Sequence, residues 1–181
     1  GGLKVRPDKK MIAFSEDTLS RRIYTIRFKD LETGEILEER IPSTSGNFVW
    51  ANDNQTGFYS IKDASLRSYK IFRHRLGTDA SEDVEVFHEA DETFSTFVYR
   101  SKSKKYIIIG SGSTLSDEYR ILQADQPLEE FQIFQKRERG LEYQIAHFED
   151  QWFVRTNWDG ATNFRLMSCR EGATDKEHWT E

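Results

Sequence analysis

The sequence predicts an all-β protein, a partial β-propeller of about four blades with four antiparallel strands each, the last one incomplete. Three observations predict this fold. Short apolar strands recur at nearly constant spacing along the 181 residues. Turn residues interrupt the chain about every 8 to 12 positions. No long window repeats its apolar residues at the three- and four-residue spacing of a helix.

The clearest repeat is a short strand that follows a polar turn. Its four copies begin at positions 11, 57, 106 and 152, so they are 46, 49 and 46 positions apart. The turns before them carry Asp, Asn, Ser and Lys, which form local hydrogen bonds in hairpins. The copies occupy residues 11–14, 57–60, 106–109 and 152–155.

A second strand follows in each unit and begins at positions 23, 69, 119 and 164, with spacings of 46, 50 and 45. The last three copies share an aromatic, a basic and an aliphatic residue in that order, which is the two-residue alternation of a strand with one packed face. We expect a polar connection of seven residues between the two strands in every unit, at 16–22, 62–68, 112–118 and 157–163.

Two further strands complete the unit. One precedes the first repeat at 3–5, 48–50, 97–99 and 143–145, and an outermost strand follows at 36–41, 84–87 and 131–134. The predicted blades therefore span approximately 1–42, 43–90, 91–138 and 139–181, and the fourth ends after Cys169 and a turn at 171–173. An immunoglobulin-like sandwich also has short strands, but it would not repeat a matched unit.

Composition excludes several classes of protein. A net charge of -5 argues against a nucleic-acid partner, because neutralising phosphates requires a positive surface. No apolar run approaches the ~20 residues of a membrane span, so no membrane partner is expected. Cys169 is the one cysteine, which excludes an intrachain disulfide. We expect it to be a buried or half-buried strand residue.

The sequence predicts no catalytic, cofactor-binding or metal-binding residue, and no cofactor. The stretch 110–113, Gly-Ser-Gly-Ser, lacks the Gly-x-Ser-x-Gly spacing and the following helix of a nucleophile elbow, so we interpret it as a loop leaving a strand. The histidines share no ligand-like spacing and are interpreted as solvated or hydrogen-bonded. They are His74, His88, His147 and His178.

Paired acids raise the alternative of a propeller glycosidase. The pairs lie at 38–39, 91–92, 117–118 and 129–130, where we expect mainly turns and solvated outer strands. A glycosidase would need carboxylates on the innermost strands. At those positions the sequence offers Lys4, Asn47 and Gln144 but few acids.

Several stretches also resemble a known family. Residues 15–18, 21–34, 44–50, 72–78 and 163–168 are similar to the propeller of the oligopeptidase B (protease II) branch of the prolyl oligopeptidase family. The resemblance covers nearly the whole chain. It implies a seven-bladed propeller joined to a C-terminal α/β-hydrolase domain that carries Ser, Asp and His and cleaves short peptides after Lys or Arg.

The function expected from this resemblance is that of a non-catalytic propeller segment. It would gate access of oligopeptide substrates to the hydrolase domain and dock on that domain, which lies outside this chain. A start without Met, at Gly1, and an end on the approach to a strand suggest a piece of a larger protein. Open strand edges would favour self-association. Without a signal peptide, we expect a cytoplasmic protein.

The alternative is a free-standing protein-interaction propeller of the WD-repeat type. Against it, the Trp-Asp signature occurs once, at 158–159, in a predicted loop.

Overall fold

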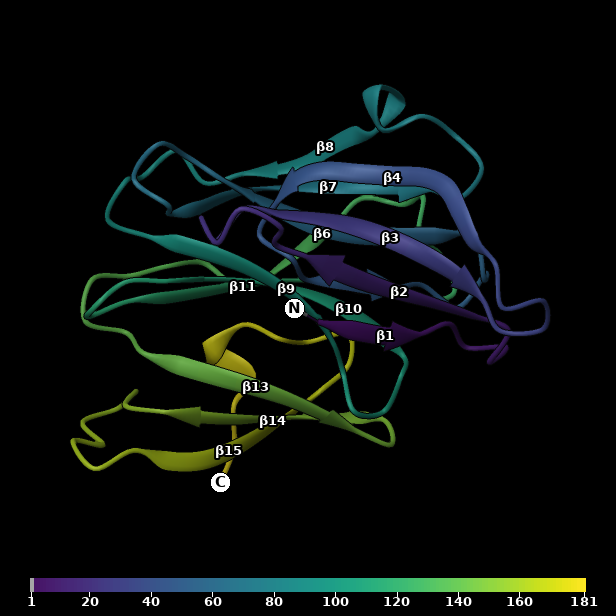
Figure 1. Cartoon of the computed structure of the whole chain (residues 1–181). Coiled ribbons are helices and arrows are strands. Elements are labelled where there is room, and N and C mark those ends of the chain that lie inside the picture. The colour runs from purple at the N-terminus through teal and green to yellow at the C-terminus, as the bar shows by residue number, and fades with distance from the viewer. Residues whose placement is uncertain (1) are drawn as a thin grey trace.

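The computed structural model describes residues 2–181, and these residues form four antiparallel sheets with two short 3-10 helices (Figure 1). The prediction of an all-β partial propeller is confirmed. In each sheet the strands follow chain order, so every blade is a meander in which neighbours in sequence are neighbours in space. Such local pairing is typical of a propeller blade.

The first sheet contains β1 (Leu3–Val5), β2 (Met11–Glu16), β3 (Tyr24–Asp30) and β4 (Ile36–Thr44). The second contains β5 (Phe48–Trp50), β6 (Thr56–Lys62), β7 (Ser68–Arg75) and β8 (Val84–His88), with helix η1 (Ala80–Glu82) before β8.

The third sheet contains β9 (Ser95–Arg100), β10 (Tyr106–Gly112), β11 (Asp117–Gln123) and β12 (Gln132–Gln135). The fourth contains β13 (Tyr143–Phe148), β14 (Gln151–Thr156) and β15 (Arg165–Arg170), followed by helix η2 (Lys176–His178). A single bridge between Ser168 and Thr180 continues the fourth sheet beyond β15.

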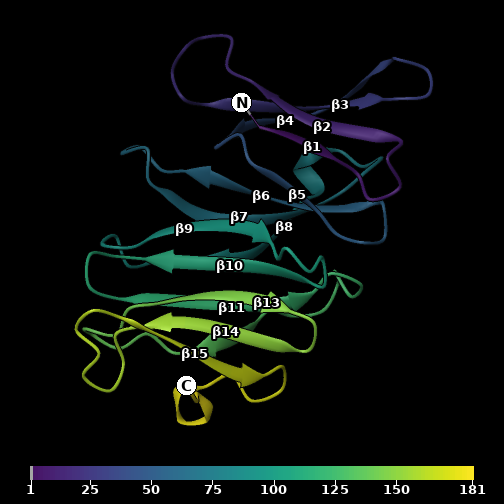
Figure 2. The same cartoon turned by 90° about the horizontal axis from the view of Figure 1, so that it is seen from below.

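The four sheets succeed one another in space as they do along the chain. Figure 2 shows them stacked in order from the purple first sheet to the yellow fourth sheet. In Figure 1 the labels of β1, β9 and β13 lie toward the middle of the view, whereas β4, β8 and β15 lie toward its periphery. β5 contacts both β1 and β9, so the first strand of the second sheet also lies on this inner side, as in a propeller.

The hydrophobic core is divided into three clusters, one at each boundary between consecutive sheets. Phe28, Trp50 and Tyr59 belong to the cluster between the first and second sheets. The boundary between the third and fourth sheets is the most aromatic and includes Tyr143 and Trp152, both fully buried. Burying a large apolar side chain contributes about 1.5–3 kcal/mol, so these boundaries stabilise the arc of sheets.

The prediction of a seven-residue connection between the second and third strands of every unit is wrong, because only the first unit has that length. The connections are residues 17–23, 63–67, 113–116 and 157–164, that is seven, five, four and eight residues. Local side-chain hydrogen bonds set these lengths. For example, Asp63 accepts from the backbone N–H groups of Ser65 and Arg67, which closes the short turn between β6 and β7.

Candidate functional site

The inner strands of the first three sheets are tied together by side chains. The indole Nε1 of Trp50 donates to the backbone oxygen of Lys4 at 3.0 Å, and Nδ2 of Asn47 donates to the backbone oxygen of Val98 at 2.7 Å. A cavity of about 170 Å³ lies among these strands. The two bonds fix the spacing of consecutive blades on the side where a propeller has its axis.

The inner strands carry no carboxylate. The sequences of β1, β5, β9 and β13 contain neither Asp nor Glu. Of the residues expected there, Lys4 and Gln144 are exposed on strands, while Asn47 lies just before β5 and is half-buried. A glycosidase needs a pair of carboxyl groups on either side of its bond, and these strands do not supply one.

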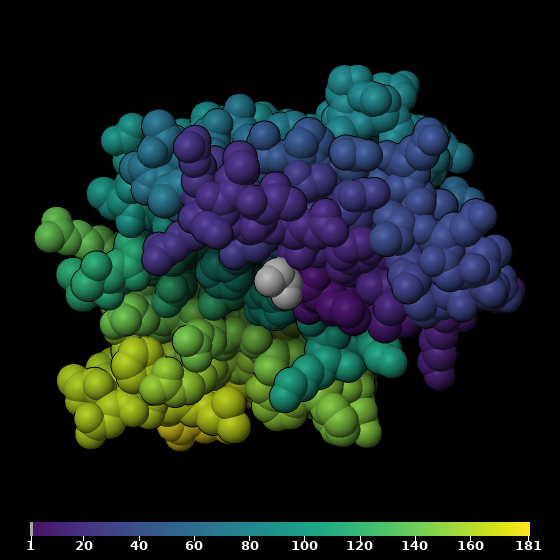
Figure 3. Space-filling model, in the orientation of Figure 1, coloured from purple at the N-terminus to yellow at the C-terminus, as the bar shows by residue number. Residues whose placement is uncertain are grey.

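The outward face of the first sheet, the face turned away from the second sheet, is apolar on its inner strands. Leu3 pairs with Phe14 and Val5 with Ile12, which places these four side chains on one face. Leu3 is 62 % exposed and Val5 47 %. In Figure 3 the purple strands of the first sheet lie at the front with no other segment over them. Apolar sheet surface of this kind suits contact with another protein surface.

The outward face of the fourth sheet has the same character on the other side of the arc. Phe148 and Leu166 are each 63 % exposed, whereas the alternating residues Trp152, Val154 and Met167 are buried against the third sheet. Both terminal sheets therefore have one packed face and one uncovered face that keeps large apolar residues.

Hydrogen bonds around His147 join the third and fourth sheets. The ring of His147 is buried, with Nδ1 2.8 Å from Oγ of Ser103 and Nε2 2.7 Å from a carboxylate oxygen of Glu171. In nucleophilic triads Nε2 faces the serine and Nδ1 the acid, which is the reverse of this arrangement. Oγ of Ser103 is also 2.8 Å from that of Ser101. These bonds connect the turn before β10 to β13 and to the segment after β15.

A second buried histidine lies between the first and second sheets. Nδ1 of His74 is 2.7 Å from a carboxylate oxygen of Asp83, whose other oxygen accepts from the hydroxyl of Tyr59 at 2.6 Å. Burial, followed by the hydrogen bond to Asp83, raises the pKa of Tyr59 well above its usual range. The ring of His74 stacks on Phe28 of the first sheet. His74 therefore takes part both in the hydrogen bonds and in the aromatic packing at the boundary between the first and second sheets.

Arg137 connects the second and third sheets. It forms ion pairs with Glu89 at 2.6 Å and Glu118 at 2.9 Å, and its guanidinium lies 3.9 Å from the ring centre of Phe94. Burial alone would raise the pKa of Glu118, but the hydrogen bonds from Arg137 and the charges of Arg120 and Arg137 outweigh it and lower that pKa. No sequence pattern indicated this Arg137 hub, because Glu89, Glu118 and Arg137 are well separated along the chain.

The interpretation of residues 110–113 as a loop is only partly right. Gly110, Ser111 and Gly112 all belong to β10, and only Ser113 follows the strand. A Cβ added at Gly110 would lie 2.3 Å from the ring of Phe97, which explains the glycine as room for that aromatic ring. The hydroxyl of Ser111 is buried within the sheet.

The other residues singled out from the sequence lie apart from one another. His88 and His178 are exposed. Cys169 is buried in β15, and burial followed by the charge of Asp175 raises the pKa of its thiol to about 12. The acid pairs do not all face solvent: Glu118 is buried and Glu39 half-buried.

Within residues 2–181, no group of three or more His, Cys, Asp or Glu side chains is arranged to hold a metal ion. In the same part of the chain, no helix has the length and apolar character needed to cross a membrane.

The geometry defines a class of protein: an arc of three four-stranded blades and one three-stranded blade, with inner strands toward the axis and two uncovered terminal faces. Comparison with known proteins gives the family. The sequence matches the family described as prolyl oligopeptidase, N-terminal beta-propeller domain, over residues 1–181. The chain belongs to this family, as part of its propeller domain.

Individual relatives support the same assignment. The chain is 41 % identical over its whole length to dipeptidyl aminopeptidase BI of Pseudoxanthomonas mexicana, of which it covers 25 %. It is 35 % identical to protease 2 of Moraxella lacunata, over 92 % of this chain and 24 % of the relative. The chain thus spans about a quarter of the length of these peptidases.

Solved structures agree with the sequence relatives. Oligopeptidase B from Leishmania major superposes with a TM-score of 0.91 at 30 % identity, covering 99 % of this chain and 26 % of that one. Oligopeptidase B from Trypanosoma brucei gives a TM-score of 0.86 at 30 % identity, covering 96 % and 24 %. The resemblance to the oligopeptidase B branch noted in the sequence is confirmed.

Proposed function

We propose that this chain is part of the propeller of a serine peptidase, where the complete ring limits substrate access to a C-terminal α/β-hydrolase domain. One observation carries the proposal: the arc of blades leaves apolar outward faces on its first and last sheets, in a chain one quarter the length of its peptidase relatives. Further blades and the hydrolase domain are the partners that such faces suit.

The proposed gating is physical rather than chemical. A closed ring of blades leaves a narrow axial passage, so short or unfolded peptides enter and folded proteins do not. Exclusion by size requires no reactive side chain on the propeller. The inner strands without Asp or Glu are compatible with this role.

The proposed substrates are oligopeptides cleaved after Lys or Arg, because protease 2 and oligopeptidase B are among the relatives. A second candidate is release of dipeptides from a free amino terminus, because the relative at 41 % identity is named a dipeptidyl aminopeptidase. Two chromogenic substrates separate the candidates in the full-length protein. One has a blocked amino terminus and a Lys or Arg before the scissile bond, and the other is a dipeptide with a free amino terminus.

Two assays test the proposal itself. The 181-residue chain alone should not hydrolyse either substrate. Turnover by this chain that a serine-directed inhibitor abolishes would show that it carries its own catalytic residues. The full-length protein should cleave short peptides and leave folded proteins intact. Cleavage of folded proteins at comparable rates would contradict gating by size.

A further proposal follows from the uncovered faces and edges. We expect the 181-residue chain in isolation to self-associate, which light scattering over a range of concentrations would detect; a monomer at every concentration would count against it.

We also propose a cytoplasmic location, which fractionation of the source cells would test. The alternative of a free-standing scaffold requires a gene that encodes no hydrolase domain after Glu181.

A further inference from the structure

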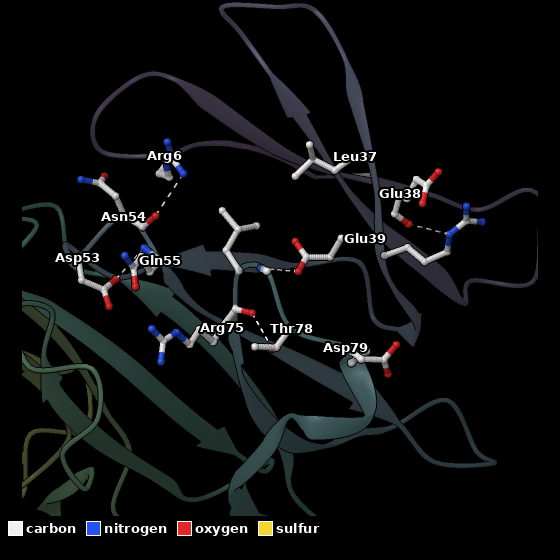
Figure 4. Close-up of a pocket in the computed structure, with 14 residues that line it drawn as sticks. Arg6, Leu37, Glu38, Glu39, Asp53, Asn54, Gln55, Arg75, Thr78 and Asp79 are labelled. Carbon is white, nitrogen blue, oxygen red and sulfur yellow. Dashed lines mark hydrogen bonds between the residues drawn. The ribbon is translucent and has the colours of Figure 1, made fainter.

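A cavity of about 930 Å³ lies at the outer rim, between the first and second sheets. Figure 4 shows its lining. One wall is residues 37–40 of β4, and the facing wall is residues 75–80, the last residue of β7 and the segment after it. Arg6 and the turn 53–55 close one end. Its volume is within the range of small-molecule binding sites, which is about 300–1,000 Å³.

The wall on β4 is built by an unusually large β-bulge. Lys29 pairs with Ile36 and Arg27 pairs with Arg40, so three residues of β3 lie opposite five of β4, and two are extra. The matching outer strands β8 and β12 each accommodate one extra residue. A bulge bends its strand and redirects side chains, and here Glu39 is directed across the blade boundary.

Glu39 is held in place by the facing wall but keeps one unsatisfied oxygen. Its Oε1 accepts from the backbone N–H of Gly77 at 2.6 Å and lies 3.5 Å from Nε2 of His74. Its Oε2 is buried and has no hydrogen-bond partner among the described residues, and neither does Nε2 of His74. An unsatisfied buried polar group costs about 1–3 kcal/mol, and more when it is charged.

Oε2 is closed to solvent, so a group in the cavity would act on the charge of Glu39 rather than hydrogen-bond to this oxygen. Because Glu39 is an acid that lines the cavity, the group that suits it is a cation such as an ammonium or guanidinium group. The opposite wall carries the complementary charge: Arg75 is exposed and forms no ion pair within residues 2–181. A guanidinium with free donors suits a carboxylate.

We propose that this rim cavity binds an amino acid or short peptide, with its cationic group on Glu39 and its carboxylate on Arg75. The site would lie on the outside of the ring, away from the axial passage, and would therefore be separate from the proposed gating. Binding of the cationic group at Glu39 and of the carboxylate at Arg75 would not depend on catalysis by the hydrolase domain.

The test uses the full-length protein and three probes: L-arginine, agmatine, which lacks the carboxylate, and acetate, which lacks the cation. Hydrogen exchange of residues 75–83, of which 75–80 line this cavity, reports on binding here by a readout other than peptidase activity. L-Arginine at millimolar concentration should slow exchange in this segment. Agmatine should do so more weakly, and acetate should have the smallest effect.

Variants assign the two contacts. Glu39→Gln keeps an acceptor for Gly77 but removes the charge, so it should weaken L-arginine binding at least about tenfold, or ~1.4 kcal/mol. Arg75→Gln should weaken L-arginine but leave agmatine unchanged. The control Glu35→Gln removes an exposed acid next to β4 and outside the cavity, and should change neither.

Two results would overturn the proposal. One is unchanged exchange of residues 75–83 in the wild type with all three probes. The other is equal protection by L-arginine in the wild type and in Glu39→Gln. Thermal unfolding of each variant checks that the fold is retained. If Glu39→Gln unfolds, Arg75→Gln still decides the matter, because loss of discrimination between L-arginine and agmatine is expected and retained discrimination contradicts the site.

Discussion

The two faces of the fourth sheet are built from the same strands but meet different surroundings. On the face toward the third sheet, Tyr143, Trp152 and Val154 are completely buried. On the outward face, Phe148 and Leu166 keep most of their surface exposed. The comparison shows that strand alternation alone makes two distinct faces, and that the outward one still carries apolar residues suited to a neighbour.

The largest difference between the faces should come from truncating aromatic residues at the packed boundary. Trp152→Ala should lower the free energy of unfolding by about 3–5 kcal/mol, because it leaves a cavity among Tyr106, Phe134 and His147. Leu166→Ala on the outward face should change it by less than about 0.5 kcal/mol in the 181-residue chain. Denaturant unfolding measures both, and similar losses would remove the distinction.

Two arginines extend the comparison to charged groups. Arg137→Ala should destabilise the chain by about 3 kcal/mol, because it leaves the buried carboxylates Glu89 and Glu118 without their shared partner. Arg155 lies on the outward face over the ring of Phe164, so Arg155→Ala should lose only about 0.5–1 kcal/mol. Thermal unfolding of the two variants provides the measurement. A larger loss for Arg155→Ala would contradict the ranking.

Gly110 tests how tightly β10 packs against the inner strand β9. Gly110→Ala places a Cβ against the ring of Phe97 and should cost about 1–3 kcal/mol. Phe97 is 43 % exposed, so part of the clash can be relieved by movement of the ring. Gly172→Ala has open space around it and serves as the control. Equal unfolding midpoints for the two variants would show that Phe97 moves freely.

The smallest expected effect is a pH dependence at the Arg137 hub. The pKa of Glu118 is lower in the folded chain than in the unfolded one, so its contribution to stability is complete above the unfolded value of about 4.3. It is lost as the pH falls through the lower folded pKa. Glu118→Gln should therefore flatten the acid side of the stability curve. An unchanged acid slope would show that Glu118 is not a source of this dependence.

The sequence predicted the repeated features of the fold and missed the features that depend on contact between repeats. The inner strands at 3–5 and 48–50 coincide with β1 and β5, because their apolar residues and the turns that follow them are local features of the sequence. The connection lengths were wrong, because individual Asp side chains close each turn differently.

The candidate site was less accessible to sequence reasoning. The approach of Glu39 to His74 depends on a bulge and a blade boundary. The Arg137 hub brings together residues from three segments. Neither arrangement has a spacing signature. One signal was present for the glycine in β10, since an isolated glycine within a strand often marks close approach of another group.

The most direct test of the account is whether the outward faces are covered in the complete protein. Leu166→Cys places a thiol on the fourth sheet where the side chain is 63 % exposed, and Cys169 on the packed face of the same strand is the internal control. Alkylation followed by mass spectrometry should label position 166 rapidly in the 181-residue chain and much more slowly in the full-length protein. Cys169 should react slowly in both. Equally rapid labelling of position 166 in both proteins would contradict the claim that further blades continue this arc.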